Sequence, residues 1–141
     1  MGSLHLLAIL LAAVVLANPA SAAPPKTLKV APSDYGPVIF DGRGFALYAF
    51  TRDKAGRSRC SGACAAAWPP YLASRLRAGT GTKSRLLGTI LRSNGARQVT
   101  YAGHPLYYYV GDNKPGEILC QGVREFGGLW LVVRGNGQLL P

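Results

Sequence analysis

The sequence is poor in acidic residues, histidine and methionine, and these shortages exclude several kinds of site. Only 6 Asp and Glu accompany 16 Lys and Arg in 141 residues, and there are 2 His and 1 Met. No Asp-x-Asp-x-Asp-Gly loop occurs, which argues against a calcium site of the EF-hand type. Copper sites draw on several imidazole or thioether ligands, so a copper site is disfavoured as well.

The short motifs of common enzymes and redox proteins are also missing. The chain has no Gly-x-Ser-x-Gly elbow, no His-Glu-x-x-His and no obvious pair of catalytic carboxylates. The haem attachment motif Cys-x-x-Cys-His is absent, and the first two of the 3 cysteines are spaced Cys-x-x-x-Cys rather than Cys-x-x-Cys. No nucleic-acid-binding motif is present. We therefore expect no catalytic residues, no cofactor, no bound metal and no nucleic-acid partner.

A single apolar run, Leu6–Leu16, lies near the N-terminus and is followed by the small-x-small pattern of residues 20–22. The run is too short to cross a bilayer as a helix, and the pattern predicts a signal peptide over residues 1–22, although residues 1–5 carry no Lys or Arg. No cysteine precedes Cys60, so no site for lipid attachment lies beside the cleavage point. We expect an exported, soluble product, in the periplasm or outside the cell, with no transmembrane segment.

The charge of the exported chain has two interpretations. Every Lys, Arg, Asp and Glu lies beyond residue 22, so the exported chain keeps the net charge of +10. The basic residues are scattered from Lys26 to Arg134 without a dense run, which is typical of a solvated surface. A net charge of this size also favours anionic partners, and for an exported protein these would be anionic cell-envelope material.

Two stretches of the chain, about 60 residues apart, follow one pattern, and a repeat of this kind indicates two units that share a core. Gly44–Asp53 corresponds to Gly103–Asp112, and Cys60 corresponds to Cys120 after a slip of one residue. Each stretch contains Tyr-x-aromatic-x-x-Asp; the six residues are Tyr48, Phe50, Asp53, Tyr107, Tyr109 and Asp112. We place repeat 1 at about residues 36–70 and repeat 2 at about residues 88–133.

Short strands joined by turns dominate the local patterns. Asp41-Gly42 separates strands expected at Val38–Phe40 and Phe45–Thr51, as in a hairpin. In the second repeat, strands are expected at Arg97–Tyr101, Pro105–Val110 and Leu129–Val133, with a turn at Ala102-Gly103 between the first two. These patterns predict a mainly β fold, a single small antiparallel domain of two pseudo-equivalent repeats.

Two further segments complete the predicted domain, which covers residues 35–141. The Ala-rich segment Ala63–Trp68 is the one expected helix, with Ser61 as a possible N-terminal cap and two prolines as the stop. Residues 23–34 contain Pro and Lys and are expected to form a flexible, loosely held lead-in.

The motifs of the two repeats resemble those of a known protein family. Besides the Tyr-x-aromatic-x-x-Asp motifs, the likeness rests on Cys60-x-Gly-x-Cys64 with Trp68-Pro-Pro, on Thr100-Tyr-x-Gly and on Gly128-x-Trp. Together these resemble a bacterial group of secreted repeat proteins, or predicted lipoproteins, of unknown function. The resemblance extends over residues 36–133 and implies an exported bacterial protein of no settled activity. The chain departs from the group in lacking a lipidated cysteine and in having Cys120.

The disulfide is open to more than one assignment, because three cysteines allow one bond in three ways. The family resemblance, together with the short separation, favours Cys60–Cys64 and leaves Cys120 unpaired. Chain entropy favours the long loop instead, since closing about 60 residues from Cys60 to Cys120 would stabilise by roughly 4 kcal/mol, against roughly 2 kcal/mol for the short loop.

The motif residues also have alternative roles. Asp53 and Asp112 follow a strand and precede a Gly-containing turn, where a carboxylate either accepts backbone N–H groups or joins a cation site between the repeats. The aromatic residues either pack in the core or form a stacking platform for sugars. Alternation along the strand places Tyr108 on the opposite face from Tyr107 and Tyr109.

These observations favour an exported, non-enzymatic envelope protein, a binding or scaffolding domain of unknown ligand. The alternative is a metal or redox accessory protein. Its candidate ligands are Cys60, Cys64, Cys120 and His104.

Overall fold

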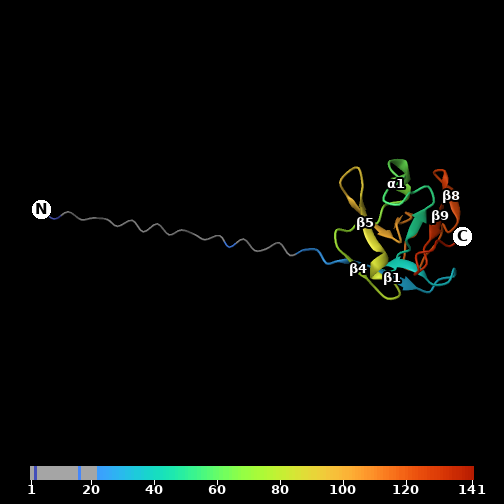
Figure 1. The fold of residues 1–141 in the computed structure, drawn as a ribbon, viewed down its shortest axis with the longest axis horizontal. Coiled ribbons are helices and arrows are strands. Elements are labelled where there is room, and N and C mark those ends of the chain that lie inside the picture. The colour runs from blue at the N-terminus through green and yellow to red at the C-terminus, as the bar shows by residue number, and fades with distance from the viewer. Residues whose placement is uncertain (1, 3–15, 17–21) are drawn as a thin grey trace.

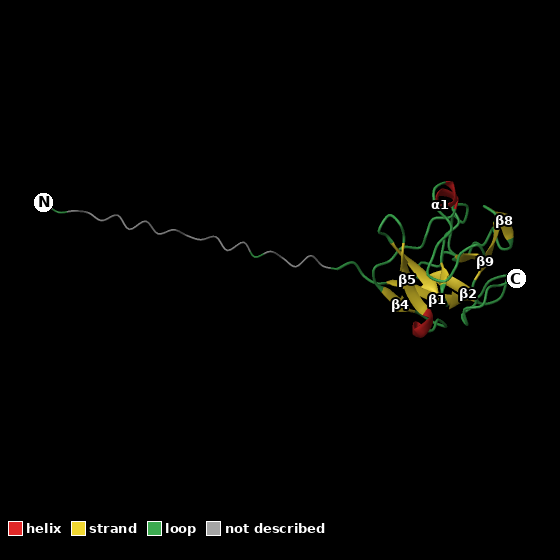
Figure 2. Ribbon diagram, turned by 45° about the horizontal axis from the view of Figure 1, so that its top comes forward, coloured by secondary structure: helices red, strands yellow, loops and turns green. Residues whose placement is uncertain are grey.

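The structure of the protein is a computed structural model that describes residues 2, 16 and 22–141. The signal peptide predicted over residues 1–22 lies outside the described residues, apart from those isolated positions. From residue 22 onward, short strands occupy the centre of the domain and long loops surround them (Figure 1, Figure 2). The prediction of a small, mainly β domain with one short α-helix is confirmed.

Nine strands form three sheets of three strands each in this part of the chain. The first sheet, in the order β2-β1-β4, consists of β1 (Lys26–Ala31), β2 (Val38–Asp41) and β4 (Leu76–Ala78). The second, in the order β3-β9-β8, consists of β3 (Tyr48–Phe50), β8 (Val123–Glu125) and β9 (Gly128–Val132). The third, in the order β5-β6-β7, consists of β5 (Leu87–Leu91), β6 (Arg97–Tyr101) and β7 (His104–Pro105).

Strand β1 lies within the segment that the sequence predicts to be a loosely held lead-in, and the structure corrects that expectation. β1 is the central strand of its sheet; it pairs antiparallel with β2 and parallel with β4. Its middle residue Leu28 is fully buried, and the Val30 N–H donates to the carbonyl of Thr80 (2.7 Å). Leu28 and Val30 alternate with polar residues, as in a strand, but the pattern is short and the prolines and lysines around it are typical of a loop. The β1–β4 pairing is also parallel, in a domain expected to be antiparallel.

A strand of the first repeat pairs with a strand of the second. β3 of the first repeat pairs antiparallel with β9 of the second, with Ala49 opposite Leu131. The hairpin expected around Asp41-Gly42 is reduced to a bridge between Phe40 and Ala46, because β2 pairs instead with β1. A hairpin is a local solution, and here the pairing between repeats replaces it.

Two turns that the sequence predicts are present. The Asp41 carboxylate accepts the N–H groups of Arg43 and Phe45, each at 2.9 Å, and so fixes the turn after β2. Between β6 and β7, Ala102 and Gly103 both have positive φ, 51° and 81°, as a two-residue hairpin turn of the primed type requires. The strand expected over residues 105–110 is cut to β7, because the chain beyond it leaves the third sheet and contacts β3.

The helix α1 (Ala63–Ala67) and the short 3-10 helix η1 (Ser84–Leu86) lie outside the sheets (Figure 2). α1 ends one residue before the expected end, with Trp68 as its C-cap. Ser61 does not cap it: the N-cap is Gly62, and no side chain hydrogen-bonds to that end. Neither helix in the described part of the chain has the length and hydropathy needed to cross a membrane.

The buried residues form two clusters, one on either side of β2 and β3. Alternation along β2 sends Val38 and Phe40 into the first cluster and Ile39 into the second. The first cluster also holds both tryptophans and all three cysteines, and the second holds Leu28 of β1. Residues from both repeats contribute to each cluster, so the repeats share their core.

Candidate functional site

The two Tyr-x-aromatic-x-x-Asp motifs meet at the centre of the domain. Tyr48 and Tyr107 exchange backbone hydrogen bonds: the N–H of Tyr48 donates to the carbonyl of Tyr107 (2.8 Å), and the N–H of Tyr107 donates to the carbonyl of Tyr48 (2.9 Å). Both side chains are fully buried. Equivalent residues of the two repeats are therefore direct partners, as an approximate twofold axis between them requires.

Each tyrosine hydroxyl crosses to the aspartate of the other repeat. Tyr48 Oη donates to Asp112 Oδ2, and Tyr107 Oη donates to Asp53 Oδ2, both at 2.7 Å. The second oxygen of each carboxylate accepts a backbone N–H of its own repeat, from Arg59 (2.6 Å) in one case and from Leu119 (3.0 Å) in the other. Each aspartate thus closes its own loop and holds the other repeat.

Burial affects the ionisation of these pairs. The pKa of both Asp53 and Asp112 is raised above the ordinary 3.8, because removal from water outweighs the hydrogen bonds that favour the carboxylate. Burial also raises the pKa of the Tyr48 and Tyr107 hydroxyls well above 10. The hydroxyls therefore keep their protons at neutral pH and act as donors.

The aromatic residues of the motifs belong to a stack of four rings. Trp68 and Trp130 lie face to face at the centre, with ring centroids 3.9 Å apart and planes 6° apart. Phe50 stacks on Trp130 (4.2 Å), and Tyr109 lies against Trp68 (4.8 Å). Each ring contacts a partner from the other repeat, so the stack joins the repeats. Trp68 and Trp130 are fully buried, so they are core residues and offer no exposed platform for a sugar.

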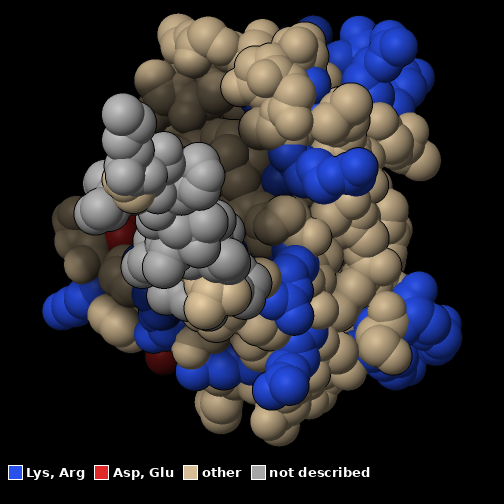
Figure 3. All heavy atoms as spheres, turned by 90° about the vertical axis from the view of Figure 1, so that its left-hand side faces the viewer, with Lys and Arg blue, Asp and Glu red and all other residues tan. Residues whose placement is uncertain are grey.

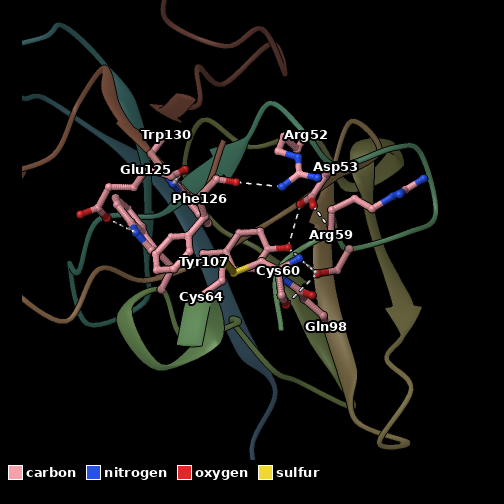
Figure 4. The surroundings of a disulfide bond; sticks show 12 residues. Arg52, Asp53, Arg59, Cys60, Cys64, Gln98, Tyr107, Glu125, Phe126 and Trp130 are labelled. Carbon is pink, nitrogen blue, oxygen red and sulfur yellow. Dashed lines mark hydrogen bonds between the residues drawn. A yellow bond between two sulfur atoms is a disulfide. The ribbon is translucent and has the colours of Figure 1, made fainter. Parts of the chain in front are cut away.

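The predicted disulfide between Cys60 and Cys64 is present, with Cα atoms 5.2 Å apart (Figure 4). Cys120, at the position equivalent to Cys60, is a free and buried cysteine. Its burial raises the pKa of the thiol, which disfavours the reactive thiolate. The long-loop pairing that chain entropy favours is not formed, because Cys60 is bonded to its near neighbour.

The ligand set of the metal alternative is not assembled. Within residues 2, 16 and 22–141, no three His, Cys, Asp or Glu side chains gather closely enough to hold a metal ion. The sulfur atoms of Cys60 and Cys64 are bonded to each other. His104 lies apart in β7, where it lines a hollow of about 130 Å³ together with Asp53, and its pKa is lowered by burial.

A hydrogen-bond network that the sequence does not predict lies beside the disulfide. Arg92 donates to Gln98 Oε1 (2.6 Å), to Ser58 Oγ (3.0 Å) and to the carbonyl of Cys60 (2.6 Å). Ser58 Oγ in turn lies 2.6 Å from the hydroxyl of Tyr107, whose ring Figure 4 shows directed at Asp53. The only available signal was an arginine directly after a predominantly apolar segment, which does not indicate its partners.

Tyr108, on the opposite face of its segment from Tyr107, lines a separate hollow of about 390 Å³. Its hydroxyl donates to Asp41 Oδ2 (2.8 Å), which also accepts from Arg43 Nε (3.1 Å). Tyr71 lies edge-on to Tyr108, with ring centroids 5.4 Å apart. The alternation predicted along this segment is therefore observed, with Tyr107 in the central pair and Tyr108 in the second cluster.

Five of the six acidic side chains make hydrogen bonds within residues 22–141, and the sixth, Asp34, is exposed. Asp41, Asp53 and Asp112 accept backbone N–H groups and tyrosine hydroxyls, as described above. Glu117 accepts the N–H of Asn113 (2.6 Å), and Glu125 accepts Trp68 Nε1–H (2.8 Å). Across residues 22–141 the single ion pair joins Arg43 to Asp41.

The basic side chains, by contrast, mostly face solvent. Figure 3 shows the face at which the N-terminal chain arrives, with Lys and Arg spread over it and few acidic atoms in view. Because only 6 acids accompany 16 bases and a single ion pair forms within residues 22–141, most of this positive charge is not neutralised at the surface.

Comparison with known proteins identifies the repeats. The profile of a family described as a secreted repeat of unknown function matches the chain twice, over residues 29–71 and 88–134. The chain belongs to this family. No curated protein and no solved structure matches it.

The secreted-repeat family match covers both Tyr-x-aromatic-x-x-Asp motifs and most of the core, and it begins within β1. Its first segment thus takes in part of the predicted lead-in. The match is consistent with an exported protein of unknown function. Residues 72–87 lie between the two matched segments and contain β4 and η1.

Proposed function

We propose that the chain is an exported, non-enzymatic protein of the cell envelope that binds anionic envelope material through its basic surface. The observation that carries the proposal is the division of charge: five of the six acids are engaged in hydrogen bonds of the fold, and most of the bases are exposed to solvent. A surface with uncompensated positive charge attracts polyanions over a range set by the ionic strength.

The central Tyr–Asp pairs support a structural role for the motif in this proposal. Both carboxylates are occupied by a tyrosine hydroxyl and a backbone N–H, and both tyrosines are buried. Motif side chains that are occupied in this way have few polar groups left to contact a ligand. Ligand binding therefore belongs to the surface that the motif holds in place.

The proposal includes removal of the predicted signal peptide, which would begin the exported protein at Ala23. Intact mass measurement of the exported protein checks this directly. A retained Met1 or a lipid adduct would contradict it. The proposal places the exported protein in the periplasm or outside the cell.

Binding is tested with the protein comprising residues 23–141 on immobilised polygalacturonate, a polymer of carboxylate-bearing sugars, and on neutral dextran as the control matrix. We expect retention on polygalacturonate at low salt that falls steeply as salt is added, because exposed charges are screened within about 8 Å at physiological ionic strength. Retention that does not depend on salt, or equal retention on dextran, would refute the proposal.

A further inference from the structure

A hollow of about 530 Å³ lies where the N-terminal segment joins the domain. Its basic wall residues are Lys26, Arg75 and Arg97. The parallel pairing of β1 with β4 places Lys26 opposite Leu76, next to Arg75, and the Ala73 N–H donates to the carbonyl of Arg97 (3.1 Å). Residues from the first and third sheets therefore converge on one concavity.

The three cations are positioned by neutral groups. Arg75 Nη1 donates to the carbonyl of Ala23 (3.3 Å), and Arg97 Nη1 donates to Thr89 Oγ1 (3.4 Å). Lys26 lines both this hollow and the hollow of Tyr108, and its Nζ lies over the ring of Tyr71, which lines the latter, 5.5 Å from the ring centroid. No Asp or Glu lines the hollow, and none pairs with these cations in residues 22–141. Like charges gathered around a concavity raise the local potential and attract an anion.

The N-terminal segment contributes to the same wall. Ala23 and Pro24 line the hollow, and Figure 1 shows the chain reaching the domain beside β4. Cleavage after residue 22 would place a free α-amino group at Ala23. Such a group has a pKa of about 7.7–8.0 and is mostly protonated at neutral pH, so export would add a fourth positive charge to the hollow.

We propose that this hollow binds the carboxylate or phosphate groups of an anionic polysaccharide, and that removal of residues 1–22 completes the site. The inference rests on the proposed function and on the predicted cleavage, and it adds the place of binding and the class of ligand. A concave site admits a sugar that carries an acidic group, whereas a flat lipid surface would contact only its rim. Leu72, which also lines the hollow and is 36% exposed, offers an apolar contact to the ring of the bound sugar.

The test compares two triple variants of the protein comprising residues 23–141, each losing three positive charges. The site variant is Lys26→Gln, Arg75→Gln and Arg97→Gln. The control variant replaces three exposed bases outside the hollow: Lys114→Gln, Arg85→Gln and Arg124→Gln. Affinity for soluble polygalacturonate is measured by calorimetry at low salt, and the thermal midpoint of each variant is recorded.

We expect the site variant to bind on the order of a hundredfold more weakly and the control variant only a few-fold more weakly, since each exposed ion pair contributes up to about fivefold. Equal losses in the two variants would overturn the site while leaving the proposed function intact. Absence of binding by the unmodified protein would refute the proposed function itself.

A second measurement leaves every side chain unchanged. The protein with Nα-acetylated Ala23 should bind polygalacturonate about fivefold more weakly than the protein with a free N-terminus, because one positive charge is lost from the wall. Equal affinities would overturn the role of cleavage. This comparison holds even if the triple site variant fails to fold.

Two other probes decide the ligand class. Binding of soluble polyphosphate with the same loss in the site variant would show that the hollow accepts phosphate groups, and binding of polygalacturonate alone would restrict it to carboxylates. Either result supports the site. Stronger binding to phosphatidylglycerol vesicles than to both polymers, equally in both triple variants, would overturn the polysaccharide assignment.

Discussion

Tyr48 and Tyr107 show how the two Tyr-x-aromatic-x-x-Asp motifs hold the repeats together through the hydroxyls of two buried tyrosines. Each hydroxyl reaches the carboxylate of the opposite repeat, and each carboxylate is fixed by a backbone N–H of its own loop. A buried carboxylate that loses a hydrogen-bond donor keeps its desolvation cost. We therefore expect Tyr48 to be energetically coupled to Asp112, and Tyr107 to Asp53, through these hydrogen bonds.

A double-mutant cycle on Tyr48→Phe and Asp112→Asn tests this coupling. We expect Tyr48→Phe alone to lower the free energy of unfolding by about 1–2 kcal/mol, with a coupling energy of roughly 1 kcal/mol in the cycle, measured by urea denaturation. The matched control is the cycle of Tyr48→Phe with Asp53→Asn, residues that no hydrogen bond joins. Equal coupling in both cycles would contradict the crossed arrangement.

The buried carboxyl groups also predict a pH dependence of stability. Because burial raises the pKa of Asp53 and Asp112 above 3.8, the folded protein holds protons that the unfolded chain has released. The contribution of these groups to stability is therefore full below pH 3.8 and declines as the pH rises through their folded pKa.

Denaturation at a series of pH values measures this contribution. In the double variant Asp53→Asn and Asp112→Asn, the decline in the free energy of unfolding above pH 3.8 should be smaller than in the unmodified protein. Asp34→Asn, at an exposed position, is the control and should leave the profile unchanged. An unfolding free energy that rises with pH more steeply in the unmodified protein than in the double variant would contradict the prediction.

At the scale of elements, the stacked rings join α1 to β9. Trp68 caps the C-terminal end of α1 and lies against Trp130 of β9, while Phe50 of β3 covers the other face of Trp130. α1 has only five residues, too few to be stable in isolation, so its position depends on this packing.

Replacement of either tryptophan by alanine should therefore destabilise the whole domain. We expect Trp68→Ala or Trp130→Ala to cost about 3–5 kcal/mol, a large part of the 5–15 kcal/mol typical of a small domain. Chemical denaturation followed by far-ultraviolet circular dichroism provides the measurement. Leu91→Ala, at a side chain that is 66% exposed, is the control. A tryptophan variant no less stable than this control would show that the stack contributes little.

At the scale of the whole molecule, neither repeat is complete without the other. β3 of the first repeat has its strand partner, β9, in the second, and the clusters that flank β2 and β3 draw on both. Contacts of such long sequence separation make the domain a single cooperative unit.

The protein comprising residues 23–141 should accordingly unfold in one thermal transition, and the fragment of residues 23–80 should not fold alone. Without β9, the buried face of β3 and its backbone groups are left without partners. Amide spectra of the two proteins decide the matter: we expect dispersed signals from 23–141 and poorly dispersed signals from the fragment. A monomeric fragment with well-dispersed signals would mean that the first repeat has its own core.

Local patterns in the sequence were sufficient for several features of this protein. The turn at Ala102-Gly103, the strand β6 and the helix at Ala63–Ala67 depend on residues that are close together in the chain, so turn chemistry and periodicity predict them. The repeat itself is visible because the same local requirements recur about 60 residues later. The Cys60–Cys64 bond was predicted from family resemblance and short separation together.

Only the tertiary structure decided which equivalent residues are partners. In a chain with two copies of one motif, Tyr48 has Asp53 and Asp112 as equally suitable acceptors, and local chemistry does not distinguish them. The choice of Asp112 follows from the antiparallel meeting of Tyr48 with Tyr107, which places each hydroxyl across the boundary between the repeats. In the same way, Lys26, Arg75 and Arg97 become neighbours only because β1 pairs with β4 and Ala73 with Arg97. These contacts join segments that are far apart in the sequence, and no local pattern predicts them.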